Sequence, residues 1–291
     1  MRISRRESAF RVEGGRADGR DLTAELTAQG YSYVTTQSDL AKVSSGKLLG
    51  LFSAKSHLDY ELDRVAKGAA NTQPSLSEMT AKAIDLLSQN SQGYFLMVEG
   101  GRIDHALHDT NAKRALQDTL AFDDAIKATI DEVKKTDPEL KNTLIVVTAD
   151  HDHTLVLNGY AKRTGKTTAG NPGVLGLVKN YETGEPSKDS DGMPYTIIGF
   201  GNGYNRVDGP RSSVAPLDDA TVSADDYHQE VVVKVGEQIA EAYLAHHKAS
   251  RNEARERVLL MLEKVHIRDP KRVYNLYPHE VSGGMGQRIM I

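Results

Sequence analysis

Phe95-Leu-Met-Val-Glu-Gly-Gly-Arg-Ile-Asp-His-Ala-Leu-His108 is the stretch that decides the fold, and Leu144-Ile-Val-Val-Thr-Ala-Asp-His-Asp-His153 repeats its pattern further along the chain. Each stretch passes from a short apolar, β-rich segment directly into acidic residues and histidines. Strand ends in α/β folds deliver metal ligands to one edge of a sheet in this way. The two stretches therefore predict half of a metal site.

The residues between the two stretches predict a long helix from about Asp109 to Lys135, with a buried stripe that includes Ala115 and Phe122. This helix ends before Asp137-Pro138. A strand, a helix and a second strand in this order form a crossover that is almost always right-handed, with parallel strands. The expected strands are Tyr94–Val98 and Leu144–Thr148. Both groups of acidic residues and histidines are then expected at the carboxyl-terminal edge of one sheet.

Other segments extend the alternation of helices and strands. Capping boxes from Ser75 to Glu78 and from Ser250 to Glu253 open two predicted helices, the first of which has one apolar face. Further helices are expected at 18–30, 235–245 and 251–265, and further strands at 31–35, 47–52, 195–200 and 231–233. The fold class is therefore α/β: an incomplete parallel-rich sheet with helices on both faces, followed by a small α-helical C-terminal tail.

Composition limits the possible functions. The chain has 291 residues, an apolar fraction of 39% and a net charge of −4, so it can form a sizeable core but is not basic enough to predict a nucleic-acid partner. It has no cysteine, so any metal must be held by His, Asp and Glu. No apolar run is long enough to predict a transmembrane segment. The N-terminus shows no signal peptide, which predicts a cytoplasmic location for the sequence as written.

Asp104 and His108 are four residues apart, so on a helical turn they face the same way and can bind one ion together. Glu99 ends the preceding strand, and the adjacent Asp150 and His151 end the next one. A lone Asp-x-x-x-His is more often a surface pair than a metal site. Two such clusters at the ends of two parallel strands favour a metal site at least as much as they favour surface pairs.

Val98-Glu-Gly-Gly-Arg-Ile-Asp-His-Ala-Leu-His108 and Val147-Thr-Ala-Asp-His-Asp-His153 resemble the two metal-binding motifs of the alkaline phosphatases. The resemblance runs from about Gly14 to Val233 and includes Gly199-Phe-Gly-Asn-Gly-Tyr204 and Asp226-Tyr-His-Gln-Glu230. It implies hydrolysis of phosphate monoesters by a two-zinc mechanism with a serine nucleophile. Family members are often homodimers, and are usually periplasmic or secreted.

The resemblance also implies a role for each matching residue. Asp104 and His108 would be ligands of the first zinc, Asp150 and His151 ligands of the second, and Glu99 a ligand of the magnesium.

Two further histidines would lie just outside this ligand set. His105 would lie near the bound phosphate, and His153 would orient a zinc-bound group.

The sequence departs from the family pattern in two places. The Asp-Ser nucleophile motif, the phosphate-binding arginine and the magnesium threonine are not found before Glu99, and the Thr-His-Gly-Gly segment expected after Glu230 is missing. On this count each zinc keeps two protein ligands and the magnesium keeps one, whereas zinc normally needs three. We therefore expect no catalytic residue on the chain, poor metal binding and no appreciable phosphatase activity.

The end of the chain resembles a second family. Tyr277-Pro-His-Glu-Val-Ser-Gly-Gly-Met-Gly-Gln-Arg-Ile-Met-Ile291 is similar to the signature region of ATP-binding subunits of dipeptide and oligopeptide ABC transporters. By that resemblance Ser282, Gly283, Gly284 and Gln287 would contact ATP. Alone, a Ser-Gly-Gly sequence is usually a turn before a helix.

These resemblances predict two parts: residues 1–233, a partial alkaline-phosphatase-like domain, and residues 234–291, a fragment of an ABC transporter ATP-binding domain. Three functions stay open. They are a phosphomonoesterase of the alkaline phosphatase type, an ATPase fragment of a peptide importer, and an inert fusion or truncation product.

Overall fold

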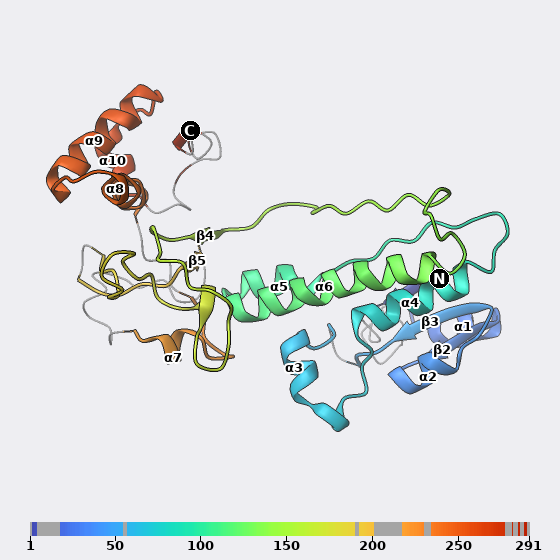
Figure 1. Ribbon diagram of the computed structural model, residues 1–291. Helices are drawn as coiled ribbons and strands as arrows, with labels where there is room; N and C mark the ends of the chain where they lie inside the picture. The colour runs from blue at the N-terminus through green and yellow to red at the C-terminus, as the bar shows by residue number, and fades with distance from the viewer. Residues whose placement is uncertain are drawn as a thin grey trace. The chain divides into compact units, whose positions relative to one another are not determined.

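The computed structural model describes residues 2–4, 18–54, 57–189, 192–200, 217–229, 234–276, 281, 285 and 288–289. The chain divides into two compact units. The first consists of Met1–His105 and Arg114–Asp150, and the second of Ala106–Lys113 and His151–Ile291. Figure 1 traces their elements.

A small parallel sheet lies in the first unit. Strand β3 (Lys47–Leu51) pairs with β1 (Arg2–Ser4) on one side and with β2 (Tyr31–Val34) on the other, and both pairings are parallel. Four consecutive residues of β3, from Leu48 to Leu51, are buried. Burial on both faces is typical of a central parallel strand, which needs a continuous apolar run. The strands predicted at 31–35 and 47–52 are confirmed.

The helices of the first unit begin at side-chain caps where the sequence provides them. Asp21 caps α1 (Leu22–Ala28), Thr36 caps α2 (Gln37–Lys42), and Ser75 with Glu78 forms the predicted capping box of α4 (Leu76–Leu87). Two shorter elements, α3 (Glu61–Ala66) and η3 (Gly68–Ala70), connect them. Helix α4 buries Met79, Ala83, Ile84 and Leu86, and part of this face completes the core around Val34, Leu40, Leu48 and Phe52.

Helices α5 (Arg102–His108) and α6 (Ala112–Val133) follow. The helix predicted at 109–135 therefore exists but begins three residues later, because Thr110 takes a left-handed backbone conformation (φ 54°) that ends α5. Ala112, Ala115, Ala125 and Val133 are the buried apolar residues of α6. Helix α5 carries Asp104 and His108 of the first predicted cluster.

The strands predicted at Tyr94–Val98 and Leu144–Thr148 are not formed. Both segments are extended chain, and within the described residues neither pairs with a sheet strand. Their apolar side chains are largely exposed, with Phe95 at 89% and Leu144 at 87%. The prediction was wrong because a strand needs a hydrogen-bonded neighbour, and no described segment supplies one.

The second unit contains a different, antiparallel pair. Strand β4 (Leu155–Leu157) pairs with β5 (Ile198–Phe200), where the sequence predicts the strand 195–200. Helix η4 (Gly173–Leu175) lies in the segment between the two strands, and α7 (Asp219–Val222) comes later in the chain. Phe200 and Val178 are fully buried.

The C-terminal helices have a core of their own. They are α8 (Val235–His246), α9 (Arg251–Lys264) and α10 (Pro270–Tyr274). The predicted helices and the capping box of Ser250 with Glu253 are confirmed. Val235, Val258 and Tyr274 belong to the shared apolar cluster, and a Cβ at Gly236 would overlap the Tyr274 ring at 2.1 Å. Only glycine fits there.

Several predictions fall on residues outside the described ranges. They are the strand 231–233, Gly201–Tyr204, Glu230, and the four ATP-contacting residues Ser282, Gly283, Gly284 and Gln287. Among the described helices, none has the length and apolar character that crossing a membrane requires.

Candidate metal centre

The centre is built on α5. Asp104 and His108 lie one turn apart on this single helix, which places their side chains on the same face. Asp104 is half-buried and His108 is exposed. Their relative position is thus fixed by the helix itself.

His153 adds a third group to this pair. Its ring meets the His108 ring edge-to-face, with ring centroids 4.6 Å apart and an interplanar angle of 86°. One ligand atom from each of Asp104, His108 and His153 lies within 4.8 Å of the other two. A carboxylate oxygen and two imidazole nitrogens are a donor set that suits zinc. The arrangement therefore fits a zinc ion in both chemistry and ligand number.

The turn after α5 sets the direction of His108. Thr110 N–H donates to Leu107 O (3.1 Å) and Asn111 N–H donates to Ala106 O (3.0 Å), while Thr110 has φ 54°. This is the Schellman arrangement, in which one left-handed residue ends a helix. Thr110 and Asn111 are fully buried, so α6 begins immediately and the end of α5 is firmly held.

Residues 225–229 hold the same turn from the other side. Gln229 is fully buried; its N–H donates to Thr110 O, and its Oε1 accepts from Ala112 N–H, both at 2.8 Å. The Asn111 side-chain amide donates to Asp225 O at 2.8 Å. The conformation of the turn is thus tied to a segment more than a hundred residues away in sequence.

Two more contacts strengthen this attachment. His228 Nδ1 hydrogen-bonds Asp109 O, and Lys113 Nζ forms an ion pair with Asp225 at 2.5 Å. Residues 225–229 therefore support the metal centre without belonging to it. The sequence singled out this segment by resemblance but gave no indication of its supporting role.

Four predicted site residues lie outside the three-residue group. Glu99 ends the exposed segment 94–98, and Asp150 and His151 are exposed. His151 Nδ1 lies 2.7 Å from Asp152 O. His105 lies on α5 beside His57, with ring centroids 4.1 Å apart. Within the described residues, the structure brings together only Asp104, His108 and His153 as a group of three possible ligands.

Arg102, at the start of α5, makes contacts of its own. Its guanidinium lies over the Tyr60 ring, 3.5 Å from the centroid, and its Nη1 is 3.3 Å from His105 Nδ1. Arg102 Nε is buried and makes no hydrogen bond within the described part of the chain. The Arg102 side chain is thus held by stacking on Tyr60 more than by ion pairing.

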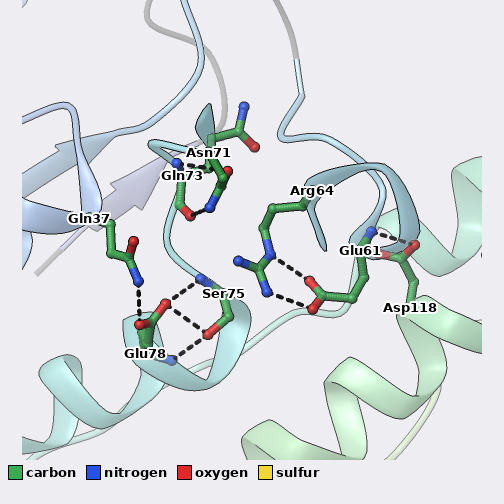
Figure 2. A network of polar contacts seen from close by, with 8 residues as sticks. All are labelled: Gln37, Glu61, Arg64, Asn71, Gln73, Ser75, Glu78 and Asp118. Carbon is green, nitrogen blue, oxygen red and sulfur yellow. Dashed lines mark hydrogen bonds and ion pairs between the residues drawn. The ribbon is translucent and has the colours of Figure 1, made fainter. Parts of the chain in front are cut away.

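A cavity of about 220 Å³ lies in the first unit, between α4, α6 and the segment 96–102. Asp118 of α6 lines it and is 8% exposed, and its carboxylate accepts from Glu61 N–H at 3.2 Å. Burial raises the pKa of Asp118 to about 6, although the hydrogen bond from Glu61 N–H and the charge of Arg102 act to lower it. Figure 2 shows this carboxylate beside the Arg64–Glu61 pair.

Asp118 was not singled out from sequence, although one signal was available. It lies three residues after Ala115 and four before Phe122, which places it on the predicted apolar stripe of the helix. A carboxylate on such a stripe is a candidate buried acid.

The family model described as alkaline phosphatase matches residues 1–242. The membrane-bound alkaline phosphatase of Bombyx mori is 40% identical over 201 residues, covering 66% of this chain and 32% of that protein. The tissue-nonspecific isozyme of Gallus gallus is 38% identical over 218 residues, covering 72% of this chain and 38% of that protein. The structure of the Thermus thermophilus alkaline phosphatase is 36% identical, covering 46% of this chain and 28% of its own, with a TM-score of 0.43.

The family match covers most of the chain, so the protein belongs to the alkaline phosphatase family. The chain spans only 32% and 38% of the length of the two relatives described above.

Proposed function

We propose that this chain is the zinc-binding portion of a phosphate-monoester hydrolase of the alkaline phosphatase type. The observation that carries the proposal is the convergence of Asp104, His108 and His153, whose ligand atoms lie within 4.8 Å of one another. Family membership supports the reaction class, and the donor set supports zinc.

A zinc ion held there would supply a Lewis acid that stabilises negative charge on a phosphoryl or leaving-group oxygen. The protein residues orient and support that position. Asp104 contributes a carboxylate and His108 an imidazole from one rigid helix, and the exposure of His108 leaves the centre open to solvent on that side. His153, by this proposal, is the third ligand and not only a group that orients the others.

The second zinc and the magnesium belong to the same proposal, with Asp150 and His151 as ligands of the former and Glu99 of the latter. Their support is the match of sequence motifs alone. These sites have fewer ligands on this chain, so they should bind metal more weakly than the three-residue group. Because the nucleophile motif is not found before Glu99, the isolated chain should not turn over phosphate monoesters.

A zinc titration tests the metal centre. Purified chain and the variants Asp104→Asn, His108→Ala and His153→Ala are titrated against a chromophoric zinc chelator, with His246→Ala as a control for a histidine outside the group. Because His153 would add a third ligand to the two counted from the sequence, we expect one zinc ion to bind more tightly than the sequence predicts. Each of the three variants should weaken binding about tenfold or more, and the control should leave it unchanged. Equal binding by all five proteins would contradict the proposal.

A phosphatase assay tests the second part of the proposal. The zinc- and magnesium-loaded chain is incubated with a chromogenic phosphate monoester, beside a complete alkaline phosphatase as positive control. We expect no turnover above that of the His108→Ala variant. Turnover that is lost in that variant would show that the chain carries its own nucleophile.

For residues 234–291 we keep the proposal of a separate helical part that resembles an ATP-binding subunit. Its support is the sequence resemblance of residues 277–291 alone; the signature residues lie outside the described ranges, and the alkaline phosphatase family match reaches residue 242, within α8. Saturable binding of a fluorescent ATP analogue that is lost in Ser282→Ala and Gln287→Ala would support it. Absence of such binding would leave this part a structural tail.

A further inference from the structure

The cavity beside Asp118 combines apolar walls with a buried carboxylate. All residues that line it belong to the first unit. Apolar side chains form much of the wall, among them Leu58, Leu76, Met79, Ala83, Leu96 and Val98. Met79 and Ala83 are buried residues of α4, so this part of the wall is held by the helix and its packing. A ligand that fills the cavity therefore needs an apolar body.

Asp118 is a polar group of this cavity that lacks a charged partner. One carboxylate oxygen accepts from Glu61 N–H at 3.2 Å, and in the described part of the chain no ion pair joins the carboxylate to a basic side chain. Arg64 is engaged elsewhere, because its guanidinium binds both carboxylate oxygens of Glu61, at 2.6 and 2.7 Å (Figure 2). Burying a carboxylate with so few partners is costly, and a cationic ligand would supply the missing partner.

Arg102 also lines the cavity but does not take this role. Its guanidinium stacks on the Tyr60 ring, 3.5 Å from the centroid, and among the described residues it forms no ion pair with Asp118. Burial raises the pKa of Asp118 to about 6, although the hydrogen bond from Glu61 N–H and the charge of Arg102 act to lower it. The carboxylate is therefore mostly ionised above about pH 7 and can pair with a cation.

The charges around the cavity favour a cationic ligand. Four carboxylates and two guanidiniums line it, from Asp59, Glu61, Glu99, Asp118, Arg64 and Arg102. An excess of negative charge in a space with apolar walls attracts cations and repels anions. The same apolar walls disfavour a bare metal ion, since magnesium and calcium need several oxygen ligands around them. These properties together indicate an organic cation.

The volume of the cavity limits the size of this cation. A cavity of about 150 Å³ can hold one benzene ring, and drug-sized ligands occupy pockets of about 300 Å³ or more. The volume of about 220 Å³ therefore suits a single ring, or a short alkyl chain, that carries a small polar group.

We propose that this cavity binds a small organic amine. Its ammonium group donates hydrogen bonds to the Asp118 carboxylate, and its apolar part contacts Met79, Ala83 and Leu96. This site does not require a bound metal, and it goes beyond the phosphatase reaction proposed above.

Isothermal titration calorimetry with 2-phenylethylamine tests the proposal. The full chain is titrated in the presence of a metal chelator, and 2-phenylethanol serves as the uncharged compound of the same size. We expect saturable binding of one amine per chain, about tenfold or more tighter than the alcohol, because only the ammonium group forms an ion pair with Asp118.

Two pairs of variants test where the amine binds. Asp118→Asn keeps the side-chain volume and should weaken amine binding about tenfold or more, whereas Asp123→Asn, at an exposed position of the same helix, should not. Ala121→Leu fills part of the cavity and should also weaken binding. Ala128→Leu, on the same helix but outside the cavity lining, is its matched control. Circular dichroism verifies that each variant is folded.

Methyl NMR of labelled methionines locates the bound amine independently of the variants. The Met79 signal should shift on saturation with the amine, because Met79 lines the cavity. The signals of Met193 and Met261, which do not line it, should stay unchanged.

Four results would overturn the proposal. They are no saturable binding of the amine, equal affinities for the amine and the alcohol, an affinity that Asp118→Asn leaves unchanged, and a shift of Met193 or Met261 without a shift of Met79. Equal affinities would show that apolar contacts alone bind the ligand.

Discussion

Thr110 is the residue on which the position of His108 depends. A φ of 54° is unfavourable for a β-branched residue, and the Thr110 hydroxyl is buried without a hydrogen-bond partner in the described part of the chain. The backbone nevertheless keeps this conformation because Gln229 binds both the carbonyl of Thr110 and the N–H of Ala112. The strained backbone conformation of Thr110 is thus maintained by hydrogen bonds to Gln229, which comes from a distant segment.

Replacing Gln229 with Met should destabilise the chain by about 1–3 kcal/mol, because the buried N–H of Ala112 loses its acceptor while the side-chain volume is kept. Urea denaturation followed by circular dichroism measures the change. Gln92→Met is the control, since Gln92 is exposed and its hydrogen bond to Asn90 Oδ1 is made by the backbone N–H, which the substitution keeps. Equal stability of Gln229→Met and the unmodified chain would remove Gln229 from its supporting role.

Asp118 makes the stability of the first unit depend on pH. Its folded-state pKa of about 6 lies above its ordinary value of 3.8, so the folded chain holds more protons than the unfolded chain between these limits. The stability associated with protonated Asp118 is therefore fully present below about pH 4 and is lost as the pH rises through about 6.

Asp118→Asn should remove this dependence. The variant should resemble the unmodified chain near pH 4 and be more stable than it near pH 7, in free energies of unfolding from urea titrations. Asp123→Asn, an exposed site on the same helix, should show no such trend. If the free energies of unfolding of Asp118→Asn and the unmodified chain differ by the same amount at every pH, the raised pKa of Asp118 is contradicted.

At the scale of elements, the features that depend only on neighbouring residues were predicted correctly from the sequence. The capping boxes of α4 and α9, the strands β2 and β3 and the long helix α6 are where sequence patterns placed them, because caps and apolar periodicity act within a few residues. Tyr94–Val98 and Leu144–Thr148 have an equally strong β pattern but do not form strands in the described part of the chain. A strand depends on a neighbour that no local pattern can guarantee.

The candidate site likewise has one part that depends on neighbouring residues and one part that depends on distant segments. Asp104 and His108 were predictable as a pair from their spacing on one helix. The approach of His153 was not, because it depends on the course of the chain between two distant segments. The attachment of residues 225–229 to the α5–α6 turn was not predictable for the same reason, because it depends on hydrogen bonds between distant segments.

The N-terminus of α4 offers a test at this scale. Ser75→Ala should cost about 1 kcal/mol, because Glu78 N–H loses its acceptor and the reciprocal bond to Ser75 N–H weakens (Figure 2). Ser91→Ala, at an exposed position after the helix, is the control. The midpoint of thermal denaturation is measured for both variants and for the unmodified chain. If Ser75→Ala has the same midpoint as the unmodified chain, the cap does not contribute to stability.

At the scale of the whole molecule, the chain combines a group of candidate metal ligands with several exposed apolar side chains. The family match reaches residue 242, within α8. The candidate ligands Asp104, His108 and His153 lie together, whereas Phe95, Met97, Leu144 and Val146, in the segments that lead to Glu99 and Asp150, are largely exposed.

The most direct test of the central claim is X-ray absorption at the zinc edge, on the chain loaded with one equivalent of zinc. The account predicts only nitrogen and oxygen neighbours at about 2.0–2.1 Å, with the outer-shell signal of two imidazoles. His153→Gln should reduce this signal to that of one imidazole. A spectrum that His153→Gln leaves unchanged would contradict the three-ligand centre formed by Asp104, His108 and His153.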